Sequence, residues 1–397
     1  MVSCVVVVII MPYALILLLL LLGKAAALPA CATDEDCSLL GDCVSGSCVC
    51  DTGFTGAACS TLAVVPGSSS LGYHNATPGV GASWGANAIF ADGLWHAFIA
   101  EMTHNCTLND YGSNSQIIHA TTPSLDAPFS KRGVAIAPFA HNPTVRALPD
   151  GSGYLLFMIG GTSATQRDCG SNYSGGGGGG GGARARARDP GTSIAVSFSA
   201  SVWGPWGAPK PLQFSNWNGS SLLDCGFTNP SPALLANGSV LLAFQAGYCH
   251  SEIPGIGEEM LGVALAPSWG GVYALVKREP ILPVPGAWCV AGLAEDPFLF
   301  QTARGFALLA HGMCYAVFNA LLAVSRDGVA WRQAAGAPYS YGAEFTDAPA
   351  QLFWRVERPQ LVFNGSRPVA LVNGVCGDGL ACLEDPGKTW TLLRGLA

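Results

Sequence analysis

The stretch Ala294-Glu295-Asp296-Pro297-Phe298-Leu299-Phe300 places two acidic residues and a proline directly before an apolar run. The same order of a polar pair, a proline and an apolar run recurs at His141-Asn142-Pro143, Thr228-Asn229-Pro230 and Glu357-Arg358-Pro359. A weaker version without the proline is found at Gly85-Ala86-Asn87. Because self-similarity along a chain indicates a repeat architecture, we interpret the five stretches as the starts of one repeating unit.

Each unit continues with further apolar runs that are separated by turn sequences. Ala91-Asp92-Gly93, Pro149-Asp150-Gly151 and Ala236-Asn237-Gly238 are signals of the kind that join hairpin strands. Five repeats of several short strands predict an all-β, five-bladed β-propeller over residues 79–397. The long interval between the second and third starts contains a low-complexity Gly/Arg segment at 174–189, which we expect to be a solvated loop.

The N-terminal segment and the cysteines indicate an extracellular protein. Residues 1–27 have an apolar run followed by small residues, as in a secretory signal peptide. The run at 5–22 is just long enough to span a bilayer, so an uncleaved membrane anchor is an open alternative. The chain has 15 cysteines and several N-x-S/T sequons, both typical of secretion. The sequons are at Asn75, Asn105, Asn172, Asn218, Asn237 and Asn364.

The charge and the motifs exclude several classes of function. The formal net charge is -7, and nucleic-acid binding requires a basic face, so no nucleic-acid partner is expected. No Cys/His spacing resembles a zinc site. The glycine run lacks the Lys-Ser/Thr of a phosphate-binding loop, and no nucleophile elbow is found.

Six cysteines lie between residues 31 and 59, and the run Cys48-Val49-Cys50-Asp51-Thr52-Gly53-Phe54-Thr55-Gly56-Ala57-Ala58-Cys59 closes them. This run resembles the closing half of an EGF-like domain, which places an EGF-like module at 28–60 and a connector at 61–78. The module lacks acidic residues just before its first cysteine, so we expect no calcium in it. A protein partner that binds through this module is an open alternative. The resemblance implies three disulfides: Cys31–Cys43, Cys37–Cys48 and Cys50–Cys59.

The eight later cysteines lie in the predicted propeller. Their pairing cannot be derived from their spacing, because eight cysteines allow 105 connectivities. We expect sequence neighbours to pair, such as Cys225 with Cys249 and Cys376 with Cys382.

The repeat starts, with Glu-Asp-Pro-Phe-Leu in the fourth unit and Glu-Arg-Pro in the fifth, resemble the five-bladed propellers of the arabinanase, levansucrase and invertase clan. Glycoside hydrolase family 43 is a branch of this clan. The resemblance implies that the strand starts surround one central pocket, which takes an oligo- or polysaccharide. No cofactor is expected, and a structural calcium in the pocket is left open. The expected substrate-binding residues are Asn87, His141, Asn142, Asn229, Gln245, His311, Arg358, Trp84, Trp288 and Trp354.

Hydrolysis of a glycoside needs a carboxylic acid and a carboxylate on either side of the scissile bond. The clan has an Asp in the first blade, whereas Asn87 stands here, and an amide cannot act as a general base. The candidate catalytic residues are therefore Glu295, Asp296, Glu101 and Glu357.

We expect Glu295 to be the acid, because Asp296 and burial should raise its pKa. Glu101 or Glu357 would then be the base. A structural interpretation is open as well, in which Asp296 caps backbone amides and Glu357 pairs with Arg358.

Two functions follow from these residues. One is a secreted glycoside hydrolase with paired carboxylates in the central pocket. The other is a non-catalytic glycan-binding or cell-surface adhesion protein, favoured by the asparagines at three of the five starts.

Overall fold

The computed structural model describes residues 31–74, 82–160, 165–169, 194–215, 225–247, 260–282, 294–312, 319–377, 379, 382 and 384–397. The predicted signal peptide or anchor, the Gly/Arg loop at 174–189, Trp288 and the predicted pair Cys225–Cys249 lie wholly or partly outside these residues. Within them, no helix is both long and apolar enough to cross a membrane.

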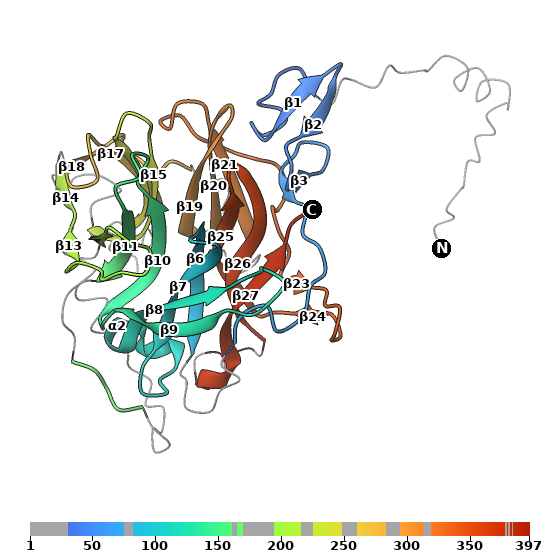
Figure 1. The fold of residues 1–397 in the computed structure, drawn as a ribbon. Coiled ribbons are helices and arrows are strands. Elements are labelled where there is room, and N and C mark those ends of the chain that lie inside the picture. Colours follow the sequence, from blue (N-terminus) through green and yellow to red (C-terminus); the bar gives the residue numbers. More distant parts are fainter. Residues whose placement is uncertain are drawn as a thin grey trace, which may run out of the picture.

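Five sheets form the blades of a β-propeller, as predicted (Figure 1). In each blade the first strand lies at the axis and its hairpin partners follow outward, with an additional strand, β14, at the edge of the third blade. Blades one and two are β6 (Ser83–Ala91), β7 (Leu94–Met102), β8 (Ser115–Thr122) and β9 (Ser130–Ile136), then β10 (Ala140–Ala147), β11 (Tyr154–Gly160), β12 (Ile194–Ser199) and β13 (Lys210–Pro211). Blade three is β15 (Cys225–Leu234), β16 (Val240–Gly247), β17 (Met260–Ala266), β18 (Val272–Leu275) and β14 (Gln213–Ser215). Blades four and five are β19 (Ala294–Thr302), β20 (Gly305–Gly312), β21 (Asn319–Ser325) and β22 (Arg332–Gln333), then β25 (Arg355–Asn364), β26 (Arg367–Cys376), β27 (Thr389–Gly395) and β5 (Gly72–Tyr73).

The fifth blade is completed by the short strand β5, which lies in the stretch predicted as a connector. Tyr73 pairs with Thr391 of β27, and Gly72 pairs with Leu392. A Cβ on Gly72 would come within 2.1 Å of the Thr391 carbonyl oxygen, so a side chain is excluded here. The start of the propeller is thereby hydrogen-bonded to its last strand, and this closes the ring of blades.

The innermost strands share one distortion near their first residues. The register shifts between His141 and Thr144 in β10 and between Glu295 and Phe298 in β19, and the same shift occurs in β6, β15 and β25. A bulge re-aims the side chains at the point where pairing is interrupted. The polar residue before the proline takes a positive φ of 53°, 49°, 55° and 54° at Asn142, Asn229, Asp296 and Arg358, respectively.

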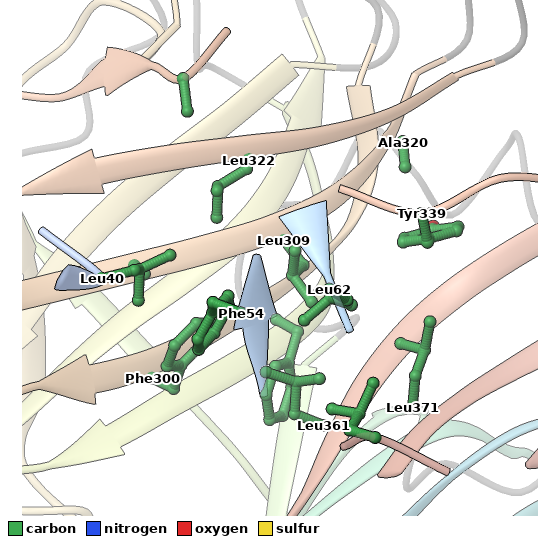
Figure 2. Close-up of a cluster of buried hydrophobic side chains, with 14 of the residues drawn as sticks. Leu40, Phe54, Leu62, Phe300, Leu309, Ala320, Leu322, Tyr339, Leu361 and Leu371 are labelled. Carbon is green, nitrogen blue, oxygen red and sulfur yellow. The ribbon is translucent and has the colours of Figure 1, made fainter. Parts of the chain in front are cut away.

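The EGF-like module packs directly on the propeller. It contains β1 (Gly41–Val44), β2 (Ser47–Cys50), β3 (Phe54–Thr55) and β4 (Thr61–Leu62). Figure 2 shows Phe54 beside Phe300 of β19, and their ring centroids are 6.3 Å apart. Leu40 and Leu62 belong to the same buried cluster as Leu309 and Leu371 of blades four and five. Because burial of apolar surface is favourable, this shared core attaches the module to the propeller.

Ion pairs surround this apolar contact. Arg304, in the turn between β19 and β20, lies 2.6 Å from Asp42 and 2.7 Å from Asp51 of the module. Glu295 is at the other end of β19, about 25 Å from this turn at the rise of a β-strand. The EGF-like module therefore lies on the face of the propeller opposite the polar starts of the inner strands (Figure 1).

Five disulfides are formed among the described residues. The three in the module join the cysteines that the EGF resemblance pairs, namely Cys31–Cys43, Cys37–Cys48 and Cys50–Cys59. Cys376–Cys382 is formed as predicted, and Cys106–Cys169, which joins the β7–β8 connection of blade one to the β11–β12 connection, also pairs two neighbouring cysteines. Disulfides of this number are typical of extracellular or secreted proteins.

Candidate functional site

A chain of hydrogen bonds joins four of the five blades around the axis. Asn142 donates from Nδ2 to Asn229 Oδ1 (2.7 Å), and Asn229 donates from Nδ2 to Asp296 Oδ1 (2.8 Å). Arg358 donates to the same Asp296 carboxylate from Nη1 and from its backbone N–H, both at 3.2 Å. All four side chains are buried. The residues that precede the prolines therefore form one connected polar arc at the centre of the propeller.

Blade one contributes no polar side chain to this arc. At the bulge of β6, the positive φ of 68° belongs to Gly85, and a Cβ there would come within 2.8 Å of Arg358 Cβ. The Arg358 side chain thus occupies the space that blade one leaves open. Arg358 Nε and Asn142 Oδ1, from the blades on either side, are buried without a hydrogen-bond partner among the described residues.

An acidic cluster lies beside the arc. Glu295, Asp296, His311 and Glu357 each place a carboxylate oxygen or ring nitrogen within 4.8 Å of the others. Asp296, His311 and Glu357 are buried, whereas Glu295 is partly exposed. Gln245 donates from Nε2 to Glu295 (3.2 Å) and accepts from Asn229, so it connects the arc to the cluster. This proximity was predicted for Glu295, Asp296 and Glu357.

Burial determines the charge state of these groups. It raises the pKa of Asp296, and the charge of Arg358 opposes this effect. Burial also raises the pKa of Glu357, against the opposing charge of Arg355, whose Nη1 lies 3.4 Å from Glu357. Burial lowers the pKa of His311 to about 4, so this imidazole is neutral at ordinary pH. A carboxyl with a raised pKa next to a second carboxyl is the usual arrangement of an acid/base pair.

The interactions of Arg358 and Glu357 in the structure differ from those predicted. We expected Glu357 to pair with Arg358. Instead Arg358 pairs with Asp296, and Glu357 lies next to Arg355 and His311. The predicted backbone cap is present, because Asp296 accepts from the Arg358 N–H. The cause is the bulge, which points Arg358 towards the axis and leaves Glu357 facing blade four.

Asn87 does not occupy the position that we predicted for it. The β6 bulge lies at Trp84 and Gly85, and its positive φ is at Gly85, so the unit starts two residues earlier than expected. Asn87 is buried deeper along the axis, where it donates to Gln360 (3.0 Å) and accepts from the Val145 N–H (3.0 Å). It serves inner-strand packing and is not part of the arc or the acidic cluster.

Arg146, which the sequence analysis did not identify, lies at the same depth as Asn87. It donates to Asn87 Oδ1 (3.2 Å), to the Pro232 carbonyl (2.9 Å) and to the Leu299 carbonyl (3.3 Å). Its guanidinium also lies 5.1 Å from the centroid of the Phe298 ring. Arg146 therefore joins four inner strands below the arc, and burial lowers its pKa to about 10. No sequence signal distinguished it from a surface arginine.

Glu101 is not part of the acidic cluster either. It is buried between blades one and five, where it accepts from Tyr73 Oη (2.7 Å), Gln116 Nε2 (2.9 Å) and Lys131 Nζ (2.6 Å). These partners satisfy both oxygens and include the closing strand β5. Glu101 is thus a structural carboxylate, and Glu357 remains as the partner of Glu295.

The remaining predicted residues are divided between core and rim. Trp84 is buried, and its ring lies so close to Gly374 that a Cβ there would be 2.7 Å from Trp84 Cδ2. His141 is buried, shares a hydrogen bond with Ser115 Oγ (2.7 Å) and has its pKa lowered by burial to about 3. Trp354 is 48% exposed just before β25, on the same side as Glu357.

Comparisons with known proteins were consistent with both parts of the chain. Residues 33–61 match the Teneurin-like EGF domain family, and no curated protein matches the chain significantly. A thermostable family-43 glycoside hydrolase is 14% identical and matches 82% of this chain and 93% of its own, with a TM-score of 0.52. The chain has an EGF-like module and the propeller fold of such hydrolases.

Two further structures share this propeller fold. A family 117 glycoside hydrolase from the marine bacterium Zobellia galactanivorans is 14% identical over 84% of this chain and 88% of its own, with a TM-score of 0.53. The α-L-arabinofuranosidase from Podospora anserina, solved with cellotriose, is 11% identical over 85% of this chain and 98% of its own, with a TM-score of 0.52. At such identities the likeness is one of fold.

Proposed function

We propose that this protein is a secreted glycoside hydrolase that acts on an oligo- or polysaccharide at the acidic cluster. The observation that carries the proposal is the proximity of Glu295 and Glu357 at the centre of the propeller, within 4.8 Å of each other. Two carboxyl groups at short range in different environments can act as acid and base.

The surroundings of Glu295 and Glu357 indicate which of the two is the acid and which is the carboxylate. Glu357 is the general acid, because burial raises its pKa and so favours its protonated form. Glu295 is the ionised partner, because it is partly exposed and accepts a hydrogen bond from Gln245, which favours a carboxylate. This assignment reverses the roles expected from the sequence. Asp296 positions the site through its bonds to Arg358 and Asn229.

The spacing also predicts the stereochemical course. Retaining enzymes separate their carboxyl groups by about 5 to 5.5 Å, whereas inverting enzymes need about 6.5 to 9.5 Å to admit a water molecule. The nearest ligand atoms of Glu295 and Glu357 lie within 4.8 Å of each other, which fits the shorter spacing better, so Glu295 would attack the anomeric carbon directly. Glu357 protonates the departing oxygen and then removes a proton from the water that releases the sugar.

Proton NMR of the first sugar released tests this proposal. The full chain is incubated with arabinan, xylan, fructan or galactan, and the anomeric signal is followed from the start of the reaction. We expect release from one of these polymers with the anomeric configuration retained. Inversion would contradict the nucleophilic role of Glu295, and no release from any polymer would contradict hydrolysis.

A non-catalytic glycan-binding protein is the second candidate. It is favoured by the central arc, in which Asn142 and Asn229 are hydrogen-bonded to each other and blade one supplies only Gly85. Amides bind hydroxyl groups but transfer no proton. Glycan binding that persists in Glu295→Gln and Glu357→Gln, without turnover in the wild type, would support it.

A calcium ion in the pocket is a further proposal, and the donors present fit one. Three carboxylates and the neutral His311 lie within 4.8 Å, and neither His311 nitrogen has a hydrogen-bond partner among the described residues. Glu295, Asp296 and Glu357 would supply the oxygen ligands that calcium prefers, as an alternative to the acid and nucleophile roles of Glu357 and Glu295, because carboxyl groups that bind calcium are ionised and occupied. A bound ion would neutralise the clustered carboxylates. An increase of the melting temperature with CaCl2, lost in Asp296→Asn, would support this site.

Secretion through the signal peptide at 1–27, rather than anchoring through 5–22, is proposed from the disulfides of the EGF-like module. N-glycosylation is proposed at exposed sequons such as Asn237 and Asn364, which lie at the β15–β16 and β25–β26 turns. A protein partner of the EGF-like module would have to bind the surface that is not packed on the propeller.

A further inference from the structure

A cavity of about 460 Å³ lies outside the acidic cluster, between the segment before β5 and the start of β27. This volume is in the range of small-ligand sites, about 300 to 1,000 Å³. Its aromatic walls are Trp390, Phe345 and the imidazole of His74, whose centroid is 4.9 Å from that of Trp390. Ser69, Gln351 and the backbone stretch 348–350 complete the lining.

The wall of this cavity is preformed. Asp347, which adjoins the lining residues, accepts hydrogen bonds from Ser68 Oγ (2.5 Å) and from the Ser69 N–H (2.8 Å). The Thr346 N–H donates to the Gly67 carbonyl at 2.9 Å. The loop at 345–350 is thus joined to the segment that leads into β5. A site held in shape before binding loses little conformational entropy when it is occupied.

The lining contributes a ring face and one side-chain amide. Trp390 presents its ring to the cavity, because its indole Nε1 is buried below the surface and out of reach of a ligand. Gln351 contributes a side-chain amide, whose Nε2 would lie 2.7 Å from a Cβ on Gly377. A side-chain amide can donate and accept hydrogen bonds, so Gln351 suits a ligand that carries hydroxyl groups.

The chemistry of the lining defines the ligand. Among the described residues, no lysine, arginine, aspartate or glutamate lines the cavity, and burial lowers the pKa of His74, so this lining is uncharged. Flat aromatic faces with a few amide and N–H groups bind a neutral ring that has an apolar face and hydroxyl groups at its edge. A sugar residue has this chemistry.

The position of the cavity relates it to the central site. In blade five, Glu357 of β25 pairs with Gly374 of β26, and Gly374 pairs with Thr391 of β27, next to Trp390. Two strand spacings amount to about 10 Å. Trp354, whose backbone N–H donates to the Cys376 carbonyl (2.9 Å), is exposed at the ends of the same strands. A glycan chain at Glu357 can therefore extend over Trp354 towards the cavity.

We propose that this cavity is a second sugar-binding site. It holds one part of a polysaccharide chain on the outer part of blade five while another part of the same chain occupies the acidic cluster. The link to the acidic cluster rests on the proposed function, whereas binding of a sugar at Trp390 and Gln351 does not. The site recognises uncharged sugar residues.

Native gel electrophoresis of the full chain in gels that contain arabinan, xylan, fructan or galactan tests this inference. We expect one polymer to retard the wild type, and the variants Gln351→Ala and Trp390→Ala to bind it about tenfold more weakly, since the first loses a hydrogen-bonding amide and the second an aromatic face. Leu352→Ala is the matched control, because Leu352 is 77% exposed next to Gln351 and does not line the cavity.

The outcomes separate this site from the hydrolase proposal. Weaker binding in the cavity variants supports the site even where no polymer is hydrolysed. Equal retardation of wild type and variants, or no retardation by any polymer, would overturn it. Asn75 follows His74 in the sequence and is a sequon. Retardation that arises only in Asn75→Gln would mean that the protein's own glycan fills the cavity, which also contradicts the proposal.

Discussion

Arg358 of blade five and Asp296 of blade four form an ion pair that is buried at the propeller axis. Arg358 Nη1 lies 3.2 Å from Asp296 Oδ1, and the two side chains are only 2% and 3% exposed. Both residues have a positive φ, which is unfavourable for arginine in particular. Their hydrogen bonds therefore hold a backbone conformation that the residue types alone would not favour.

Removing one partner of this pair should strongly destabilise the protein. In Asp296→Ala the Arg358 guanidinium would remain buried without its carboxylate, and we expect the free energy of unfolding to fall by about 3 to 5 kcal/mol. Urea unfolding measures this difference. Arg326→Ala, which removes the exposed pair with Glu35, should cost less than about 1 kcal/mol. Equal losses in the two variants would contradict a special role for the buried pair.

The contact between Trp84 and Gly374 should tolerate no added methyl group. In Gly374→Ala the new Cβ would lie 2.7 Å from the indole ring, and overpacking of this kind costs about 1 to 3 kcal/mol. Gly133→Ala is a matched control, because no atom lies within 4 Å of a Cβ at that position. Thermal unfolding compares the two variants. A Gly374→Ala protein as stable as Gly133→Ala would mean that Trp84 does not pack there.

Stability should decrease in acid because of His141. Its folded-state pKa is lowered to about 3 by burial, whereas an unfolded histidine titrates near 6.5. The unfolded chain therefore binds more protons between these values, so the contribution is complete above about pH 6.5 and is lost as pH falls towards 3. Each pKa unit corresponds to about 1.4 kcal/mol.

The pH dependence of urea unfolding in His141→Gln checks this expectation. The variant should lose less stability than the wild type between pH 7 and pH 4. His104→Gln, at an exposed site, should follow the wild type. An unchanged pH dependence in His141→Gln would assign the acid sensitivity to other groups.

Arg304 should hold the EGF-like module on the propeller. Its guanidinium is only 12% exposed and lies within 4 Å of Asp34, Asp42 and Asp51. Arg304→Ala would leave three carboxylates without their shared cation, so we expect faster proteolytic release of residues 31–59 than in the wild type. The buried contact of Phe54 with Phe300 is unchanged in this variant. Release at the wild-type rate would show that the apolar contact alone suffices.

The sequence was sufficient to predict the propeller because its polar-residue-proline starts have a physical cause. Proline lacks the backbone N–H, and asparagine and aspartate tolerate a positive φ, so both fit the bulge of an inner strand. The start of blade one was wrongly predicted at Asn87, because Gly85 stands where the other four blades have a polar residue before a proline. The closing strand β5 was missed because two residues show no alternation.

The central site was predicted only in part for a related reason. Sequence places Glu295 and Glu357 at equivalent positions of adjacent blades, so their proximity could be inferred. The sequence did not indicate that Glu101 would turn towards Tyr73 and Lys131, since this orientation depends on how blade one packs against the strand that closes blade five. Arg146 and the cavity at Trp390 depend likewise on contacts between segments that are far apart in the chain.

The catalytic efficiency of Glu295→Gln and Glu357→Gln is the most direct test of the account. It is measured as kcat/KM for release of reducing ends from the polymer that the wild type cleaves, with Glu279→Gln as an exposed control. We predict a loss of about 100- to 10,000-fold in each of the two variants and wild-type values in the control, because each variant lacks a proton-transferring or attacking carboxyl group. Wild-type efficiency in either variant would contradict the assignment of the acidic cluster as a hydrolytic site.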